Sequence, residues 1–343
     1  MSNGQEMKIA HLVDDRRMGG VTRFLDCLSA MRPSDEVFHV QRHSLRARKY
    51  DAVTIVSHLA ISWRSLPMLI ALRACNPSAR LVHVEHSYSR GFEEHRVSKP
   101  GRFHTLLRTV YALFDQVICV SEGQENWMHE IGIVPDRKTV VATPLVDLAP
   151  FLAIAPAAPS KTVRYGFVGR LDDQKGMDLA VEAWKLIAPA NATLEIFGDG
   201  PRREALEAQA ADIPTIRFHG RVDNPALAYE SIDVAILPSR WEPYGLSCLE
   251  ARAAGRPVIV SDVDGLPEQV DEAGGLVVQR GLAPWLKIFA HAPENLWNAE
   301  RSAQAKQRAV EENARSTAIW NAVLDGAPLA ESAAPPVLVS SRA

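Results

Sequence analysis

The feature that most limits the fold of this 343-residue chain is a regular alternation of short apolar runs with helical patterns, which occurs twice. Alternation of this kind is typical of α/β domains in which helices cover both faces of a parallel sheet. In the first half we expect strands at Met7–Val13, Ala52–Val56, Leu81–Glu85, Gln116–Ser121 and Thr139–Thr143, and helices at Gly20–Met31, Leu66–Arg73 and Glu122–Ile131. In the second half we expect strands at Arg164–Val168, Thr193–Phe197, Ile216–His219, Val234–Leu237 and Pro257–Val260, and helices that include Asp178–Ile187 and Arg202–Ala210.

The stretch between the two halves has a different composition. Residues Leu148–Lys161 read LAPFLAIAPAAPSK, in which eight of fourteen residues are Ala or Pro. Three prolines in so short a stretch oppose regular structure, so we interpret it as a linker between two domains. The expected parts are an N-terminal Rossmann-like domain at 1–155, a C-terminal Rossmann-like domain at 156–310, a helix at 311–326 that packs back toward the N-terminal domain, and a disordered tail at 327–343.

The composition is that of an ordinary globular protein, with 47% apolar and 23% charged residues and a net charge of -3, which gives no general attraction to nucleic acid. Residues 1–155 carry 19 Lys+Arg and 16 Asp+Glu, a net charge of +3, and the remainder carries -6. A positive half can face an anionic surface or substrate, although scatter explains so small a difference equally well. The four cysteines have no metal-ligand spacing, and we find neither a signal peptide nor a run of about 18 apolar residues, so we expect a cytoplasmic protein.

The most informative segment is Val234–Gly255, which reads VAILPSRWEPYGLSCLEARAAG. A buried strand is followed by a polar loop and by a helix that begins near Gly245. Ligands of parallel α/β sheets bind beyond the carboxyl ends of the strands, and amides at a helix N-terminus attract anions, so we expect Gly245 and Leu246 to face an anion. Glu242 in the loop can accept hydrogen bonds from sugar hydroxyls, and Glu250 in the helix can hold a ribose. Taken singly, either glutamate is better explained as a helix-start or solvated residue.

Two cations lie in the loop GRLDDQKG, which follows the expected strand Arg164–Val168. Arg170 and Lys175 are therefore also at the ligand edge of a sheet, where together they can neutralise a pyrophosphate. The alternative is that they form surface ion pairs with Asp172 and Asp173.

The string EPYGLSCLE, from Glu242 to Glu250, resembles the E-x(7)-E motif of retaining glycosyltransferases of the GT-B fold, which have two facing Rossmann-like domains with a cleft between them. Its context resembles family 4, the glycosyl transferases group 1. Further segments of the second half match in order, namely VGRLDDQKGMDLAVEAW, IFGDGPRREALE, HGRVDN and GRPVIVSDVDGLPEQV. The first half matches less extensively, at MKIAHLVDDRRMGGVTRFL, VEHSY and ICVSEG.

This resemblance implies transfer of a hexosyl-type sugar from a nucleoside-diphosphate sugar, with retention of the anomeric configuration. It implies catalytic roles for Glu242, His86, Arg170 and Lys175. The donor-binding residues that it implies are Gly19, Gly20, Arg170, Lys175, Gly198, Arg221, Val222, Glu242, Tyr244, Gly245, Leu246 and Glu250. In similar enzymes the two cations take over the role of a metal, and no D-x-D pair stands in the expected place, so we predict no required metal and no other cofactor.

The first half contributes the glycine pair Gly19–Gly20 and several histidines. The glycine pair opens a helix, where bare backbone can approach a phosphate, although an ordinary tight turn is equally consistent. His86 ends the strand Leu81–Glu85, and in similar enzymes a histidine at such a position touches the transferred sugar. His58 is a weaker candidate for the acceptor side. Three other histidines are expected to be core residues, namely His39, His83 and His219.

The first domain is the acceptor-side domain in similar enzymes. Residues 90–108, RGFEEHRVSKPGRFHTLLR, carry a net charge of +3, with Pro100–Gly101 expected to break any helix. Four apolar residues are expected to serve as anchors, namely Phe92, Phe103, Leu106 and Leu107. The expected partners are a glycan or lipid-linked acceptor of cell-surface polysaccharide synthesis and an anionic membrane at its inner face. A solvated loop and helix that only closes the domain is the alternative.

Three other functions fit the sequence less well. A nucleotide-sugar 2-epimerase of the same fold would need a distinct carboxylate set, which we do not find. A non-catalytic sugar-nucleotide binding protein is disfavoured by the intact set of Glu242, Glu250, Arg170 and Lys175. A dinucleotide-dependent dehydrogenase needs G-x-G-x-x-G after the first strand, where this chain has DDRRMGG. The sequence does not identify the sugar, the base or the acceptor.

Overall fold

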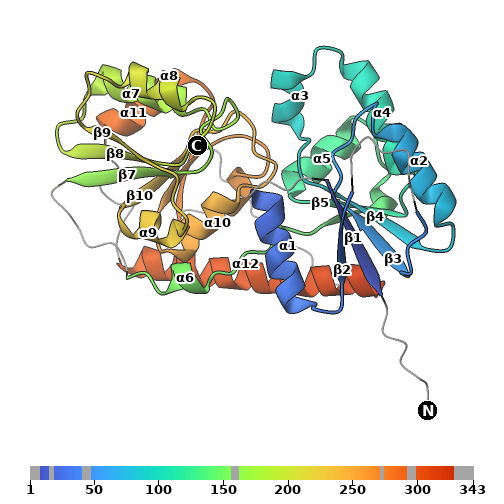
Figure 1. The fold of residues 1–343 in the computed structure, drawn as a ribbon. Helices are drawn as coiled ribbons and strands as arrows, with labels where there is room; N and C mark the ends of the chain where they lie inside the picture. Colours follow the sequence, from blue (N-terminus) through green and yellow to red (C-terminus); the bar gives the residue numbers. More distant parts are fainter. Residues whose placement is uncertain are drawn as a thin grey trace. The chain divides into compact units, whose positions relative to one another are not determined.

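The structure is a computed structural model that describes residues 8–14, 19–40, 48–155, 162–270, 274–291 and 299–327. Its contacts divide the chain into two compact units: unit 1 comprises residues 1–146 and 313–343, and unit 2 comprises residues 147–312. Each unit is built around a parallel sheet of six strands (Figure 1). The predicted fold class is therefore confirmed. The tail expected at 327–343 lies outside the described residues except for Ala327.

The sheet of unit 1 has the order β2-β1-β3-β4-β5-β6. Its strands are β1 (Ile9–Val13), β2 (Glu36–His39), β3 (Thr54–Ser57), β4 (Arg80–Glu85), β5 (Gln116–Cys119) and β6 (Thr139–Val141). β1 and β3 are buried along their whole length, as expected for strands that helices cover on both faces. Sequence analysis did not predict β2, whose side chains are mostly exposed and form no apolar run.

The sheet of unit 2 has the order β12-β11-β10-β7-β8-β9. Its strands are β7 (Val163–Val168), β8 (Ala192–Phe197), β9 (Ile216–Gly220), β10 (Val234–Leu237), β11 (Val258–Ser261) and β12 (Gly275–Val278). Strands β7 and β10 are neighbours, with Tyr165 paired to Val234, although two strands separate them in sequence. The order therefore reverses beside β7, which makes the gap between β7 and β10 a topological switch point.

Helices cover these sheets. In unit 1 they are α1 (Gly20–Met31), α2 (Leu66–Cys75), α3 (Arg90–Arg96), α4 (Pro100–Ala112), α5 (Glu122–Glu130) and the short 3-10 helix η1 (Asp136–Lys138). In unit 2 they are α6 (Ala149–Leu152), α7 (Met177–Ile187), α8 (Arg203–Gln209), α9 (Pro225–Glu230), α10 (Leu246–Ala253), η2 (Pro267–Gln269) and α11 (Leu282–Ala290). Figure 1 shows α7, α8 and α11 on one face of the unit 2 sheet and α9 and α10 on the other. Side-chain caps fix some of the helix starts, as where Ser121 Oγ accepts a hydrogen bond from the Gln124 amide at 3.1 Å.

The last helix, α12 (Ala299–Asp325), belongs to both units, because the division falls between Glu312 and Asn313. Within unit 1, the Trp320 ring packs on Phe24 with 4.8 Å between centroids, and its Nε1 donates to the Thr143 carbonyl at 2.8 Å. The other division falls between Val146 and Asp147, before the expected boundary at residue 155.

The expected linker and the expected helix break both need correction. The one-turn helix α6 lies inside the stretch that we interpreted as linker. Its Pro150 is in the first turn, where a backbone N–H has no partner within the helix, so proline is tolerated there. Residues 156–161 lie outside the described part of the chain. The helix break expected at Pro100–Gly101 is present, but it falls just before the proline, between α3 and α4, and Pro100 begins α4.

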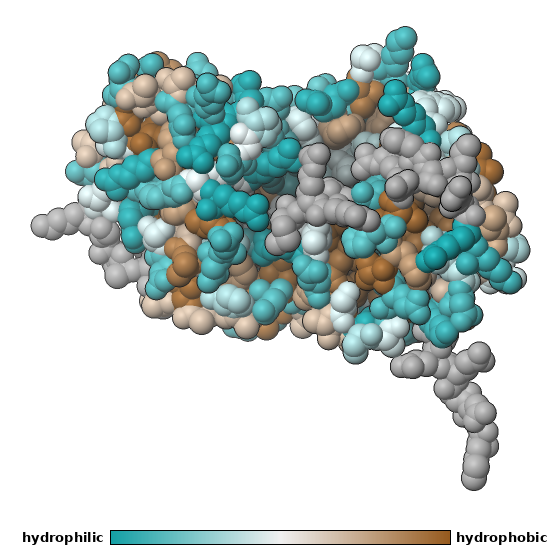
Figure 2. Space-filling view, viewed as in Figure 1, coloured by the Kyte–Doolittle hydropathy of each residue, from teal (hydrophilic) through white to brown (hydrophobic). Residues whose placement is uncertain are grey.

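The apolar anchors expected in residues 90–108 are largely core residues. Leu106 is 4% exposed and Leu107 is fully buried, both within the hydrophobic core of unit 1, and Phe103 packs against that core. They therefore do not form an apolar surface. Figure 2 shows hydrophilic and hydrophobic residues interspersed over the visible face, and none of the described helices is long and apolar enough to cross a membrane.

The backbone at the switch point of unit 2 is packed too tightly for a side chain. Gly176, the residue before α7, has φ +63°, and a Cβ atom there would lie 2.1 Å from the Pro238 carbonyl oxygen, just after β10. The Arg240 amide donates to the Gln174 carbonyl at 2.8 Å across the same gap. Glycine at position 176 therefore lets the loops after β7 and β10 touch backbone to backbone.

We predict that Gly176→Ala destabilises the protein more than Gly132→Ala. Gly132 has the same φ, +63°, but nothing lies within 4 Å of its Cβ position. Both variants should lose about 1–2 kcal/mol to left-handed backbone strain, and Gly176→Ala should lose a further ~1–3 kcal/mol to overpacking. Urea unfolding of both variants and the parent protein measures the difference. Equal losses in the two variants would show that the loops separate at little cost.

Candidate active site

The centre of the unit 2 site is an ion pair between Lys175 and Glu242. Lys175 lies in the loop after β7 and Glu242 in the loop after β10, so the pairing of these two strands brings them together. The Lys175 side chain is 18% exposed and that of Glu242 is 9% exposed. The ammonium and the carboxylate are thus mostly removed from water, and each supplies the counter-charge that the other needs.

Glu242 is held from several sides. Its amide donates to Asp264 Oδ2 at 2.8 Å, and its carbonyl accepts from the Gly265 amide at 3.2 Å. Ser239 Oγ donates to the carboxylate at 3.4 Å. The Glu242 carboxylate is therefore held in place beside the start of α10, where it can accept hydrogen bonds from hydroxyl groups.

The second predicted cation, Arg170, is in a different environment. Its side chain is 60% exposed, with Nε 3.5 Å from Asp172 Oδ2. This contact matches the surface-pair alternative for Arg170, whereas the Lys175 ammonium forms its ion pair with Glu242. The loop therefore carries one partly buried cation, which is oriented by its ion pair, and one exposed cation.

The same loop is tied to the helix that follows it. The guanidinium of Arg240 forms two hydrogen bonds to the Asp178 carboxylate, at 2.8 and 2.6 Å, which also lower the pKa of Asp178 against the effect of its burial. Sequence analysis did not single out Arg240 or Asp178. These two residues join the loop after β10 to α7. Their contact depends on the pairing of β7 with β10, which no local sequence motif reveals.

The start of α10 lies beside the ion pair. Gly245 is its N-cap residue, and the amides of its first turn lie beyond the reach of the helical hydrogen-bond ladder, as at any helix N-terminus. The Tyr244 side chain points away to another partner, because its hydroxyl donates to Glu312 Oε1 at 2.5 Å, while its carbonyl accepts from Gln269 at 2.6 Å. Further along α10, Glu250 is 2% exposed and accepts a hydrogen bond from the Tyr229 hydroxyl at 3.2 Å. Glu250 is therefore a buried residue, and the solvated alternative for it is wrong.

The glycines predicted for the nucleoside side are explained first by backbone packing. Cβ atoms at Gly198 and Gly200 would lie 1.8 and 2.3 Å from the carbonyl oxygens of Gly169 and Leu171, respectively. These positions need glycine because the loop after β8 packs directly on the loop after β7. Arg221 and Val222 lie in the loop after β9, and the Arg221 side chain is 64% exposed, with its Nε 3.9 Å from Asp223 Oδ1.

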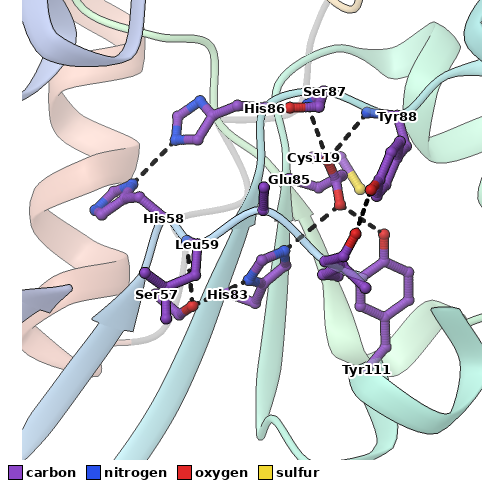
Figure 3. Close-up of polar contacts among 12 residues, drawn as sticks. Ser57, His58, Leu59, His83, Glu85, His86, Ser87, Tyr88, Tyr111 and Cys119 are labelled. Atoms are coloured by element: carbon purple, nitrogen blue, oxygen red, sulfur yellow. Dashed lines mark hydrogen bonds and ion pairs between the residues drawn. The ribbon is translucent and has the colours of Figure 1, made fainter. Parts of the chain in front are cut away.

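In unit 1 the strand end that carries His86 is held by a buried carboxylate (Figure 3). Glu85 accepts hydrogen bonds from the amides of Ser87 at 2.8 Å and Tyr88 at 3.0 Å and from the Tyr111 hydroxyl at 2.9 Å. Burial by itself raises the pKa of Glu85. The nearby His83 and the hydrogen bonds from these amides lower the pKa by more than burial raises it, so the net shift is downward. The turn at His86 is therefore fixed around an ionised group.

His86 is hydrogen-bonded to the weaker candidate, His58, with 3.0 Å between His86 Nε2 and His58 Nδ1. Burial lowers the pKa of His86 to about 4 and that of His58 well below its usual value, so both rings are neutral at pH 7. A third imidazole, His11, continues the series on the other side of His58. Sequence analysis missed His11, which lies inside the apolar strand β1.

The glycine pair and the remaining histidines are placed as follows. Gly19 has extended backbone and precedes α1, which begins at Gly20, as predicted. His83 is buried as expected, but the core prediction is wrong for His39, which is exposed, and for His219, whose side chain is 38% exposed and stacks on Phe197. Within the described ranges, no group of three or more His, Cys, Asp or Glu side chains is arranged to hold a metal ion.

Two family models match the chain. The model described as Glycosyltransferase Family 4 matches residues 16–149, and the model described as Glycosyl transferases group 1 matches residues 162–290. Glycogen synthase of Mycobacterium tuberculosis is 32% identical over 283 residues, which cover 78% of this chain and 64% of that protein. An uncharacterized glycosyltransferase of Methanocaldococcus jannaschii is 41% identical over 119 residues, 33% of this chain and 30% of that protein. The chain thus spans less than two thirds of the length of these relatives.

Solved structures share the fold. HepE of Anabaena, determined in complex with UDP-glucose, superposes with a TM-score of 0.71 at 18% identity, covering 92% of this chain and 100% of that one. Sucrose-phosphate synthase of Thermosynechococcus elongatus gives a TM-score of 0.72 at 19% identity, with coverage of 94% and 100%. The two α/β units thus match the two-domain GT-B architecture. With one family model on each unit, the chain belongs to glycosyltransferase family 4, the glycosyl transferases group 1.

Proposed function

We propose that this protein is a retaining glycosyltransferase that moves a hexosyl-type sugar from a nucleoside-diphosphate sugar to a glycan or lipid-linked acceptor. The observation that carries the proposal is the mostly buried ion pair of Lys175 and Glu242 beside the N-terminus of α10. A cation and a set of helix-start amides suit the diphosphate of such a donor, and a fixed carboxylate suits its sugar hydroxyls. HepE, which shares the fold, was solved with UDP-glucose, so UDP is the first nucleotide to test.

In the proposed complex, Lys175 and Arg170 bind the diphosphate together with the amides of Gly245 and Leu246. Glu242 accepts hydrogen bonds from hydroxyls of the transferred sugar. Glu250 binds the ribose. This requires the Glu250 carboxylate to accept a hydrogen bond from the ligand in addition to the one that it accepts from Tyr229. The diphosphate then replaces Glu242 as the nearest anion to Lys175, so that the lysine exchanges one counter-charge for another.

The proposed reaction breaks the bond between the anomeric carbon and the diphosphate oxygen and forms a bond from the acceptor oxygen on the same face of the sugar. The leaving phosphate takes the proton from the acceptor hydroxyl. Negative charge grows on the diphosphate as its bond breaks, and the two cations and the α10 amides stabilise it. The protein's contribution is therefore preorganised electrostatics, and we propose that no metal is required.

Unit 1 supplies the remaining groups in this proposal. His86 forms a hydrogen bond to the transferred sugar, and the backbone at Gly19–Gly20 contacts the donor phosphates. We propose that the acceptor belongs to cell-surface polysaccharide synthesis on the cytoplasmic side of the membrane. The basic residues of α3 and α4 favour an anionic acceptor or lipid headgroup, without the apolar anchors that sequence analysis expected.

We predict that Lys175→Ala and Arg170→Ala weaken nucleoside-diphosphate binding. The wild type is first screened with UDP, GDP, ADP and dTDP, and the nucleotide that raises the melting temperature most is used for the variants. Because Lys175→Ala also leaves Glu242 without its counter-charge, each variant is compared with its own ligand-free state. We expect a smaller ligand-induced shift in both variants and turnover lower by roughly 100-fold or more.

The matched control is Lys185→Ala, an exposed lysine of α7 in the same unit. It should keep the shift and turnover of the wild type. A wild-type shift in both the Lys175 and Arg170 variants would show that the diphosphate binds elsewhere.

We predict that Glu242→Ala and Glu250→Ala have different kinetic effects. Glu242→Ala should lower kcat, on the order of 100-fold, because the sugar loses a hydrogen bond that strengthens in the transition state. Glu250→Ala should act mainly on the KM of the donor, because it contacts the ribose. Release of the nucleoside diphosphate measures both constants. Glu195→Ala removes an equally buried carboxylate of the same unit and is the control, since Glu195 pairs with Arg217 and His219. Wild-type kinetics in folded Glu242→Ala protein would refute the role of Glu242.

A further inference from the structure

Three imidazoles and a carboxylate form one continuous series in unit 1. His86 Nε2 lies 3.0 Å from His58 Nδ1, and His58 Nε2 lies 3.0 Å from His11 Nδ1. The far nitrogen of the last ring, His11 Nε2, lies 3.5 Å from Asp35 Oδ2. His11 lies in β1, and His58 and His86 follow β3 and β4, so three neighbouring strands place the rings in a row.

The series is buried and well supported. Neighbouring rings stack with 5.3 Å between centroids, and Phe24 packs against both His58 and His86. Figure 3 shows the rings of His58 and His86 turned toward each other. His11 is 1% exposed and His58 is 6% exposed, whereas His86 is partly exposed. The series thus runs from the interior to one accessible end.

Its interior end is an anion with its own counter-ion. Arg32 Nε donates to Asp35 Oδ2 at 2.9 Å, and the rest of the guanidinium is held by Asn321 at 3.1 Å and Asp325 at 2.7 Å, both in α12. Asp325 shares this guanidinium with Asp35. At mildly alkaline pH, where imidazole side chains are in general neutral, His11 meets the Asp35 carboxylate as an uncharged ring. An ionised carboxylate only accepts hydrogen bonds, so His11 must donate from Nε2.

This one donor sets the direction of every other hydrogen bond. A neutral imidazole carries a single N–H, so His11 Nδ1 is an acceptor and His58 must donate to it from Nε2. His58 Nδ1 is then an acceptor, and His86 must donate to it from Nε2. The low pKa values of His58 and His86, which burial causes, keep both rings neutral as this scheme needs. The other titratable groups nearby, His83 and Glu85, contact each other and lie outside the series.

We propose that Asp35, His11 and His58 are positioning residues that hold His86 as its Nε2–H tautomer, so that His86 Nδ1 accepts a hydrogen bond from a substrate hydroxyl. His86 is then an acceptor at its accessible end and not a donor. Its substrate contact rests on the function proposed above, but the tautomer is a property of the protein alone. A ligand with a hydroxyl group at this position satisfies the acceptor, whereas one with an ether or carbonyl oxygen there leaves it unpaired.

The test is nuclear magnetic resonance of protein labelled with 15N in its histidines, recorded without any donor at mildly alkaline pH. Long-range couplings identify which ring nitrogen carries the proton. We expect His86 to be protonated at Nε2 and unprotonated at Nδ1, with one form populated. His58→Phe keeps an aromatic ring beside Phe24 but removes both hydrogen bonds, so we expect His86 to become a mixture of tautomers.

Asp35→Leu is the second variant, because it removes the acceptor at the interior end and leaves all three rings in place. It should also yield a mixture at His86. His129→Gln is the matched control: this histidine of α5 is hydrogen-bonded to Thr139 in the same unit but is not part of the series, so His86 should be unchanged. Protonation of His86 at Nδ1 in the wild type would overturn the proposal, as would an unchanged His86 tautomer in both folded variants. Because no donor is present, either result is independent of whether the protein transfers a sugar.

Discussion

The pairing of β7 with β10 is the constraint on which the unit 2 site depends. These strands are neighbours in the sheet although β8 and β9 lie between them in sequence, and α7 and α10 leave them toward opposite faces. The loops after these strands therefore meet at one point, and a ligand of an open α/β sheet binds beyond the strand ends at such a switch point. Lys175 and Glu242, 67 positions apart, form an ion pair because of this strand order. Gly176 makes the approach possible, since its missing side chain leaves room for the Pro238 carbonyl.

Unit 1 uses the same geometry for different chemistry. Its strand order also reverses, since β1 lies between β2 and β3, and the helices after β1 and β3 again begin at one edge. In unit 2 this edge holds a cation and an anion, which can pair with charged groups of a ligand. In unit 1 it holds neutral imidazoles packed against Phe24, where burial disfavours the imidazolium form. The first edge suits a diphosphate, and the second suits an uncharged hydroxyl group.

The sequence predicted those parts of the fold that are coded locally. The long buried strands were found within one or two residues, because strands covered on both faces are continuous apolar runs. The edge strand β2 was missed, since its residues are mostly exposed. The basic segment around Leu106 and Leu107 predicts surface anchors, and only the packing of α4 shows that both are core residues.

The candidate site was predictable residue by residue but not as an arrangement. Lys175 and Glu242 were both singled out from their loops, yet their direct pairing depends on the order of strands in the sheet, which the alternation pattern leaves open. His11 gave no signal at all, because one histidine in the run IAHLV is usually a core residue. The role of Asp35 was not predictable from the sequence either, because its partners Arg32 and His11 belong to different parts of the fold.

The ion pair of Lys175 and Glu242 also bears on how the proposed charged donor can bind without a large desolvation penalty. Taking a single charge out of water costs several kcal/mol, so a buried cation that waited alone for a phosphate would destabilise the unit. Pairing it with Glu242 avoids that cost while the donor is absent. When a diphosphate arrives, the lysine can turn to the phosphate, and sugar hydroxyls can take over as hydrogen-bond donors to the glutamate. Each group then exchanges one partner for another, and neither is left buried and unpaired. The additional charge of the diphosphate needs a second cation, and Arg170, which is mostly exposed, can supply it without having been desolvated beforehand.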